Sequence, residues 1–153
     1  MPALLGAKCE AGEFLDYRIT GTTDYGQFYH RFTNMLMGKF RKYLFISKIR
    51  EISGSCAGVS CYQYDSKGVN LNTHVTKAIR VAHGSEIYVV FFGEILENAY
   101  RLDISPCVAR KEAVVECDSR CVLLDVTGQS DDELQKVLSL ISSSPVEDSI
   151  LQY

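Results

Sequence analysis

The stretch S-E-I-Y-V-V-F-F-G-E-I-L, residues 85–96, decides the fold class that this sequence predicts. From Ile87 to Phe92 it holds six consecutive residues that are all β-branched or aromatic. Successive side chains of a β-strand point to opposite faces of a sheet, so this strand would be apolar on both faces. The run therefore predicts a central strand with other parts of the protein covering each face. Gly93, directly after it, predicts a bulge or a bend.

Similar stretches, rich in β-branched and aromatic residues and separated by turn residues, lie on both sides of this run. We predict strands at 14–20, 43–52, 57–64, 69–82 and 100–104, and a hairpin of 112–117 with 121–126. Asp118-Ser119-Arg120 would be the turn of that hairpin, which would place Cys117 and Cys121 opposite each other. Short turns between neighbouring strands favour an antiparallel sheet or a partly closed barrel.

Two segments show the apolar spacing of amphipathic helices. Asp24 and Gln27 form a capping-box pattern, and the aromatic residues after them repeat every three or four positions up to Lys42. Ser130 and Glu133 form a second capping box, and apolar residues follow at helical spacing up to Ile141. We therefore expect helices over 24–42 and 130–141, which together could cover the apolar faces of the central strand.

These patterns predict an α+β fold with a mostly antiparallel sheet or partly closed barrel of about seven strands. One helix would lie in the N-terminal half and one near the C-terminal end. The 153 residues suit a single domain, predicted over 1–144. Residues 145–153 are predicted to be a flexible tail, and residues 1–13 an arm.

Charge and hydropathy narrow the classes of function. The formal net charge is −3, which argues against a dedicated nucleic-acid-binding domain, because such domains are usually strongly basic. No apolar run reaches the length of about 18 residues that a membrane-spanning helix needs. The first residues lack the basic segment of a signal peptide. We therefore predict a cytoplasmic or nuclear protein.

The six cysteines are predicted to be reduced thiols, because the cytosol keeps thiols reduced. They are Cys9, Cys56, Cys61, Cys107, Cys117 and Cys121. Disulfide pairing and metal binding are the alternatives. The spacings within 56–61 and 117–121 are wider than the C-x-x-C of a zinc knuckle, and His74 and His83 could join a metal site only if the fold brings them close. No metal and no cofactor is predicted, and the glycines form no phosphate-binding loop.

A cluster of cations is the one candidate binding site in the sequence. Five basic residues occur within residues 39–50 of an otherwise acidic protein. The cluster contains Lys39, Arg41, Lys42, Lys48 and Arg50, and Tyr62 and Tyr64 lie on the next predicted strand. It can be read as cations at a helix C-terminus beside a solvated edge. The alternative is a patch for RNA, a phosphoinositide or an acidic protein segment, with the tyrosines stacking on bases.

Two partial resemblances to known families accompany these patterns. K-Y-L-F-I-S-K-I, V-S-C-Y-Q-Y-D and I-Y-V-V-F-F-G, within residues 42–96, resemble the strand layout of Tctex-type dynein light chains. V-T-G-Q-S-D-D-E-L-Q-K-V-L-S-L-I, after several antiparallel strands, resembles the C-terminal part of a pleckstrin-homology domain, although this chain lacks the tryptophan of that helix. Both resemblances imply binding modules rather than enzymes.

The function that we expect is a non-catalytic binding or assembly module, either a protein–protein interaction subunit or a homodimer. The expectation rests on the missing catalytic motifs, the many tyrosines and the candidate edge strands. It also rests on the face of the central strand that would stay uncovered if both helices packed on the same side. One alternative is a phosphate-recognising domain that uses the cation cluster. Another is a small enzyme, which would need a cysteine beside His30, His74 or His83, because a nucleophilic thiol needs a base within hydrogen-bond reach.

Overall fold

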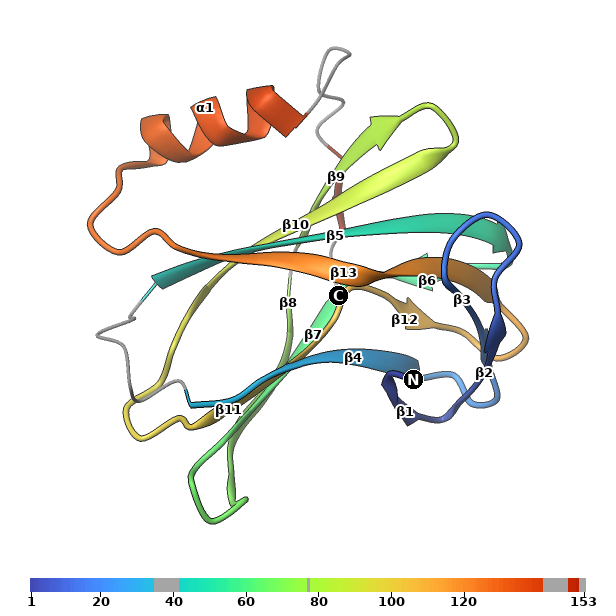
Figure 1. The fold of residues 1–153 in the computed structure, drawn as a ribbon, viewed down its shortest axis with the longest axis horizontal. Coiled ribbons are helices and arrows are strands. Elements are labelled where there is room, and N and C mark those ends of the chain that lie inside the picture. Colours follow the sequence, from blue (N-terminus) through green and yellow to red (C-terminus); the bar gives the residue numbers. More distant parts are fainter. Residues whose placement is uncertain (35–41, 77, 142–148, 152–153) are drawn as a thin grey trace.

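The computed structural model describes residues 1–34, 42–76, 78–141 and 149–151, and it shows a mostly β protein with two antiparallel sheets (Figure 1). The first sheet contains, in order, β6 (Cys56–Ala57), β12 (Val108–Ala109), β4 (Gly26–Phe32), β11 (Arg101–Ser105), β7 (Val59–Tyr64) and β8 (Asn70–Thr76), with β1 (Ala3–Leu5) also paired to β4. The second contains β14 (Ser149–Leu151), β9 (Ala78–His83), β10 (Glu86–Glu94), β5 (Lys42–Ser53), β13 (Val114–Asp125), β3 (Tyr17–Gly21) and β2 (Ala7–Ala11).

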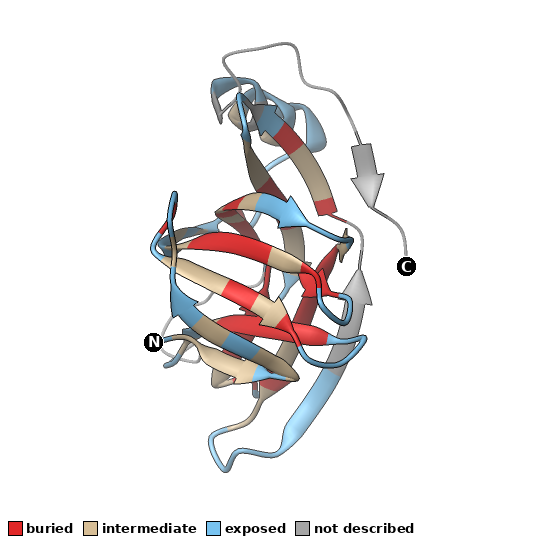
Figure 2. Ribbon diagram, turned by 90° about the vertical axis from the view of Figure 1, so that its right-hand side faces the viewer, coloured by how far each residue is buried: buried red, intermediate tan, exposed pale blue. Residues whose placement is uncertain are grey.

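The α+β prediction is wrong, because helix makes up only 7% of the chain. In the described ranges the helical element is α1 (Asp131–Ile141), which lies against the outer face of the second sheet (Figure 1). The core lies between the two sheets, where Phe28, Phe45 and Ile104 are buried together. Figure 2 shows the buried residues gathered along the central strands, whereas α1 is mainly exposed. None of the described helical residues forms a segment long and apolar enough to cross a membrane.

The predicted helix over 24–42 is the largest error. Residues 26–32 form strand β4, and residues 35–41 lie outside the described part of the chain. Phe28 points into the inter-sheet core. Tyr29, the next residue, is buried as well, and its ring lies 5.4 Å from the ring of Tyr62 on β7. A strand buried on both sides carries adjacent aromatic residues, and these mimic the apolar stripe of a helix.

The predicted central strand is confirmed as β10, which lies between β9 and β5. Val89 and Phe91 face the inter-sheet core, and Val90 faces the opposite side. Leu134 and Val137 of α1 pack on that second side. The run is therefore covered by the other sheet on one face and in part by a helix on the other.

The capping box of the C-terminal helix is also confirmed. The backbone N–H of Glu133 donates to Ser130 Oγ at 3.3 Å, and the Ser130 N–H donates to Glu133 Oε2 at 3.2 Å. Together these two bonds satisfy donors at the helix start that the helix itself leaves without partners.

The predicted arm, by contrast, forms β1 and β2. In the predicted tail, 149–151 pair with β9, and 145–148 and 152–153 lie outside the described residues.

Two predicted connections differ in the structure. The segment 69–82 is divided between β8 in the first sheet and β9 in the second, so it joins the two layers. The predicted hairpin over 112–126 is a single strand, β13, which pairs with β5 on both sides of an irregularity. Cys117 lies opposite Ile49 and Cys121 opposite Ser47, so residues 118–120 form a bulge opposite Lys48. Residues 118–120 have the composition of a turn, but here they form a bulge within one strand and the chain does not reverse.

The cysteines are only partly free thiols. A disulfide joins Cys56 to Cys107, with 5.8 Å between their Cα atoms, whereas Cys9, Cys61, Cys117 and Cys121 carry free thiols. The sequence predicts six reduced thiols, and the pairing of β6 with β12 is what brings this pair together. The two cysteines are 51 residues apart, so their proximity is not visible in the sequence.

This pairing predicts a labelling pattern. Iodoacetamide added to the unfolded protein without a reductant is expected to alkylate the four free thiols, and six after reduction. Intact-mass spectrometry distinguishes the two products. A Cys56→Ser/Cys107→Ser variant is the control, because its labelling should not change on reduction. Six labels on the unreduced wild-type protein would contradict the disulfide.

Candidate functional site

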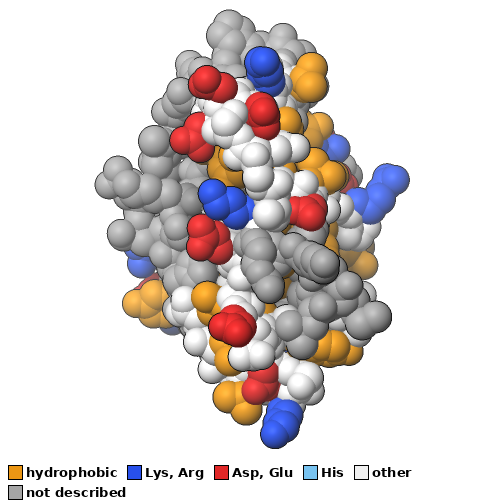
Figure 3. All heavy atoms as spheres, turned by 90° about the vertical axis from the view of Figure 1, so that its left-hand side faces the viewer, with side chains coloured by type: hydrophobic (Ala, Val, Ile, Leu, Met, Phe, Trp, Pro, Cys, Tyr) orange, Lys and Arg blue, Asp and Glu red, His pale blue; other side chains and the backbone are white. Residues whose placement is uncertain are grey.

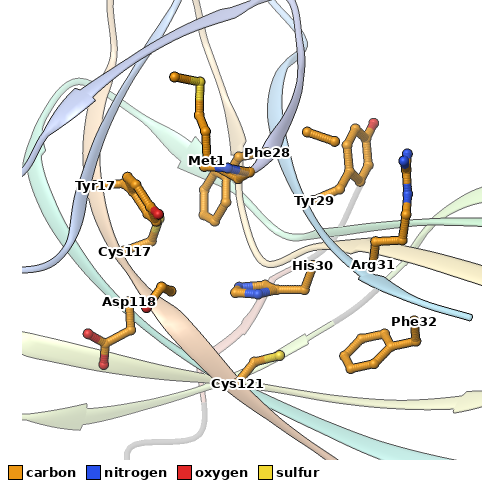
Figure 4. Close-up of a pocket in the computed structure, with 13 residues that line it drawn as sticks. Met1, Tyr17, Phe28, Tyr29, His30, Arg31, Phe32, Cys117, Asp118 and Cys121 are labelled. Carbon is orange, nitrogen blue, oxygen red and sulfur yellow. The ribbon is translucent and has the colours of Figure 1, made fainter.

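A cleft of about 530 Å³ lies between the two sheets, where β4 faces the bulge of β13 (Figure 4). Tyr17, Cys117 and Asp118 line one side of this inter-sheet cleft, and Phe28, His30 and Phe32 line the other. The bulge continues this lining with Ser119 and Cys121. Because bulges turn side chains away from a regular sheet and are common beside active sites, we treat the cleft as the candidate functional site.

Ser119 is fixed in the bulge by Asp16. The backbone N–H and the hydroxyl of Ser119 both donate to Asp16 Oδ2, at 2.8 and 2.6 Å. These two bonds lower the pKa of Asp16, which keeps its carboxylate ionised at neutral pH. The bulge is thereby attached to the segment that precedes β3, and the shape of the cleft depends on this contact.

His30 is the polar group at the centre of the cleft (Figure 4). Its Nε2 lies 3.3 Å from Ser47 Oγ, and its ring packs against Phe28 and Phe45 at 6.1 and 5.7 Å. Burial lowers the pKa of His30 to about 4, although the nearby Asp118 carboxylate opposes this change. The imidazole is therefore uncharged at neutral pH, with one ring nitrogen as donor and the other as acceptor.

The thiols in the cleft are held in their protonated form. Burial raises the pKa of Cys121 to about 11, and burial also raises the pKa of Cys117 far above its ordinary value. A thiol attacks as a thiolate, so neither group is activated as a nucleophile at neutral pH. This arrangement gives little support to the alternative of a cysteine- and histidine-dependent enzyme.

Each charged side chain that lines the cleft has an ionic partner. Asp118 lies 3.3 Å from Lys48 Nζ, and Lys48 lies at the same distance from Glu86. On the other side, Arg31 donates from Nε and Nη2 to the two oxygens of the buried Asp103, both at 2.9 Å. Besides these paired charges, the described lining presents aromatic rings, thiols, a hydroxyl, a neutral imidazole and the N-terminal residues 1–3.

The predicted cation cluster is divided by the fold. Lys39 and Arg41 lie outside the described residues, and Lys42, Lys48 and Arg50 follow one another along β5. Lys42 is exposed, Lys48 is ion-paired with Glu86 and Asp118, and the Arg50 guanidinium lies 3.6 Å from the Phe14 ring centre. On the face in Figure 3, coloured basic and acidic side chains are interspersed.

The two tyrosines predicted to assist the cations belong to the other sheet. Tyr62 and Tyr64 stack on each other along β7 with ring centres 6.3 Å apart, and Arg101 lies over Tyr64. They are therefore not on a strand beside β5, and among the described cations of the cluster the structure does not bring them together with Lys42, Lys48 or Arg50. Phosphate binding through these residues stays a prediction.

The described residues contain no group of three or more His, Cys, Asp or Glu side chains arranged to hold a metal ion.

A second cavity, of about 660 Å³, lies between α1 and the ends of β5 and β10. Phe92, Ile79 and Leu134 give it an apolar lining, and Lys42 and Asp131 lie at its border. Its polar border and apolar interior come from the contact of α1 with the sheet. The described residues that line it include no histidine or cysteine, so they offer fewer chemical functions than those of the inter-sheet cleft.

Sequence reasoning missed the cleft because the predicted helix over 24–42 included His30, which lies on strand β4. The alternation Phe28, His30, Phe32 is the signal of a strand that points three ring side chains to one face. Nothing in the sequence shows that the bulge of β13 lies opposite these rings. That proximity depends on the pairing of β13 with β3 and β5.

The architecture defines the class of protein, two antiparallel sheets packed around one core. No protein-family model matches the sequence, and no curated protein matches it significantly, so neither family resemblance is supported. The fold is similar to part of the enzymatically active domain of tailspike protein 4 from bacteriophage CBA120, with a TM-score of 0.52 and 9% sequence identity. The match covers 80% of this chain and spans only 19% of the tailspike chain, so it supports the fold alone.

Proposed function

We propose that this chain is a non-catalytic binding and assembly module that forms a homodimer through the outer face of its second sheet. The observation that carries the proposal is the exposure of two neighbouring apolar side chains on β13. Val122 and Leu124 are 44% and 43% exposed, and they lie opposite Ile46 and Leu44 of β5. Exposed apolar side chains that gather on one sheet face are typical of interaction surfaces.

The helix α1 covers this outer face only in part. Leu134 and Val137 pack over Leu44, Val81 and Val90. Towards the other end of the face, Ile46, Tyr88 and Val122 surround a hollow of about 180 Å³. We call the surface formed by Ile46, Tyr88, Val122 and Leu124 the outer apolar patch. Tyr88 brings the central strand β10 into this patch, on the face that α1 covers only in part.

The charges around the outer apolar patch suit a second copy of the same surface. Arg120 and Lys48 supply positive charge beside the hollow, and Asp118 and Glu86 supply negative charge close to them. In a two-fold symmetric interface the same patch meets itself, so charged groups at its border must be of both signs if they are to attract each other across the interface. The patch meets this requirement, with an apolar centre and a border of mixed charge.

The proposal predicts a change of oligomeric state in Val122→Asp. The wild-type protein is expected to sediment at about twice its chain mass of 17.1 kDa, and the variant at that mass, because each dimer would bury two unpaired carboxylates. Analytical ultracentrifugation at several concentrations measures this.

Val69→Asp is the matched control, because it makes the same substitution at a residue that is 56% exposed and lies beside the first sheet. This control should remain dimeric. A wild-type protein that is monomeric at every concentration, or a dimer that Val122→Asp leaves intact, would refute self-association through this surface.

A further inference from the structure

We propose that the inter-sheet cleft is a binding site for a small, uncharged, planar aromatic molecule. None of the four residues of the outer apolar patch lines the cleft, which opens between the sheets, although Asp118 and Cys121 of the bulge border both the cleft and the hollow beside the patch. The inference therefore goes beyond the proposed function and does not depend on it.

The aromatic side chains of the cleft set the shape of the ligand. Tyr17 comes from β3 of the second sheet, whereas Phe28 and Phe32 come from β4 of the first (Figure 4). A flat ring placed between the two sheets can contact these rings face to face or edge to face, the two arrangements that aromatic pairs prefer. The cleft volume of about 530 Å³ lies within the range of small-molecule sites and can hold two or three rings.

His30 supplies directional recognition inside this aromatic lining. Ser47 engages Nε2 at 3.3 Å, and among the described residues Nδ1 has no hydrogen-bond partner. A neutral imidazole can donate or accept at that nitrogen, depending on its tautomer. Cys121 adds a thiol, a weak donor, at the border of the bulge. The ligand therefore needs one polar group, such as an amine N–H or a hydroxyl, at the position facing His30.

The pairing of charges argues for an uncharged ligand. Asp118 is held by Lys48, and Arg31 is held in a two-pronged contact by Asp103. A charged ligand would lose its hydration in the cleft without gaining a free counter-ion from these side chains, which is unfavourable. An uncharged aromatic molecule has no such penalty and gains from apolar burial.

A matched pair of fluorescent probes tests this selectivity. N-phenyl-1-naphthylamine is an uncharged three-ring amine, and 8-anilinonaphthalene-1-sulfonate has the same rings with one added sulfonate. We expect saturable binding of the uncharged probe by the full chain, with one site per chain. The sulfonate is expected to bind at least roughly tenfold more weakly. Equal affinity for the two probes, or no saturable binding of the first, would overturn the proposal.

Three variants locate the probe. Ser119→Trp at the exposed border and Cys121→Phe inside the cleft both fill the space, so each should weaken binding of the uncharged probe by roughly tenfold or more. Val122→Asp is the control, since it changes the residue next to Cys121 but on the opposite face of β13. It should leave the affinity unchanged, even though the proposed function expects it to disrupt the dimer.

Thermal unfolding by circular dichroism shows which variants are folded. If Cys121→Phe is unfolded, Ser119→Trp decides the result, because its side chain is exposed and its backbone N–H keeps the bond to Asp16 when the hydroxyl is lost. Unchanged affinity in the folded cleft variants would overturn the site. A loss of binding in Val122→Asp alone would also overturn it, because the probe would then lie on the outer apolar patch.

Discussion

Replacing Glu116 by alanine is expected to lower the free energy of unfolding by about 3–5 kcal/mol, the usual result of removing one partner from a buried ion pair. Glu116 is fully buried on β13. Its Oε1 accepts from the backbone N–H groups of Phe14 and Leu15 at 2.7 and 2.9 Å. Its Oε2 accepts from Arg18 Nε and Nη2 at 3.0 and 2.7 Å. Alanine would remove the acceptor of the two amides and of Arg18 Nε, and would leave Arg18 Nη2 only its longer contact with Glu13 Oε2 at 3.4 Å.

The contribution of Glu116 should depend on pH. Burial opposes ionisation, but the amides of Leu15 and Phe14 and the Arg18 guanidinium outweigh it and lower the pKa of Glu116 to about 2. The folded protein therefore binds this proton less readily than the unfolded chain, whose pKa is near 4.5. The stabilisation is complete above about pH 4.5 and is lost as the pH falls towards 2.

Urea unfolding of the wild-type protein and Glu116→Ala at neutral pH and at about pH 3 measures this effect. The difference between the two proteins should be large at neutral pH and smaller in acid. Glu97→Ala is the control, because Glu97 is exposed and should change stability by less than about 0.5 kcal/mol. An equally small effect of Glu116→Ala, or a difference that grows in acid, would contradict this account.

Gly93→Ala is expected to destabilise the fold by about 1–3 kcal/mol through overpacking. Gly93 pairs directly with Tyr43 in the regular register of β10 and β5, so it does not mark a bulge. A Cβ atom at Gly93 would overlap the Tyr43 ring. That ring cannot move easily, because Tyr43 is fully buried, packs against Phe91 at 5.6 Å and lies 3.5 Å from Cys61 Sγ through its hydroxyl.

A double-mutant cycle tests this explanation. Tyr43→Leu removes the ring, so Gly93→Ala should cost clearly less in that background than in the wild-type protein. Urea unfolding of the four proteins gives the coupling between the two sites. If the effects of the two substitutions on the free energy of unfolding were additive, the space needed by the Tyr43 ring would not explain why position 93 is a glycine.

The sequence predicts local structure well where a residue pattern fits only one kind of secondary-structure element. The six β-branched or aromatic residues of 87–92 favour a strand that is apolar on both faces, and β10 is such a strand. The capping box at Ser130 depends on residues three positions apart, so its bonds form within one turn. These features were predictable because the contacts that create them are close in the sequence.

The errors arise where distant contacts decide between two local readings. Phe28, Tyr29 and Phe32 fit a helical stripe as well as a strand, and the pairing of β4 with β1, β11 and β12 selects the strand. Residues 118–120 fit a turn as well as a bulge, and the pairing of β5 on both sides selects the bulge. The candidate cleft lies between β4 and the bulge of β13, the two segments that were predicted wrongly, so it could not be found from the sequence.

The position of β3 in the second sheet has a consequence for the synthesis of the chain. Strand β3 pairs with β2, which is close in sequence, but its other neighbour is β13, and Arg18 and Glu116 are 98 residues apart. Ribosomes add about 5–20 residues per second, so β13 follows β3 after roughly 5–20 s. During that interval the open edge of β3 can pair with other nascent chains. We expect the growing polypeptide to need chaperones most between these two strands.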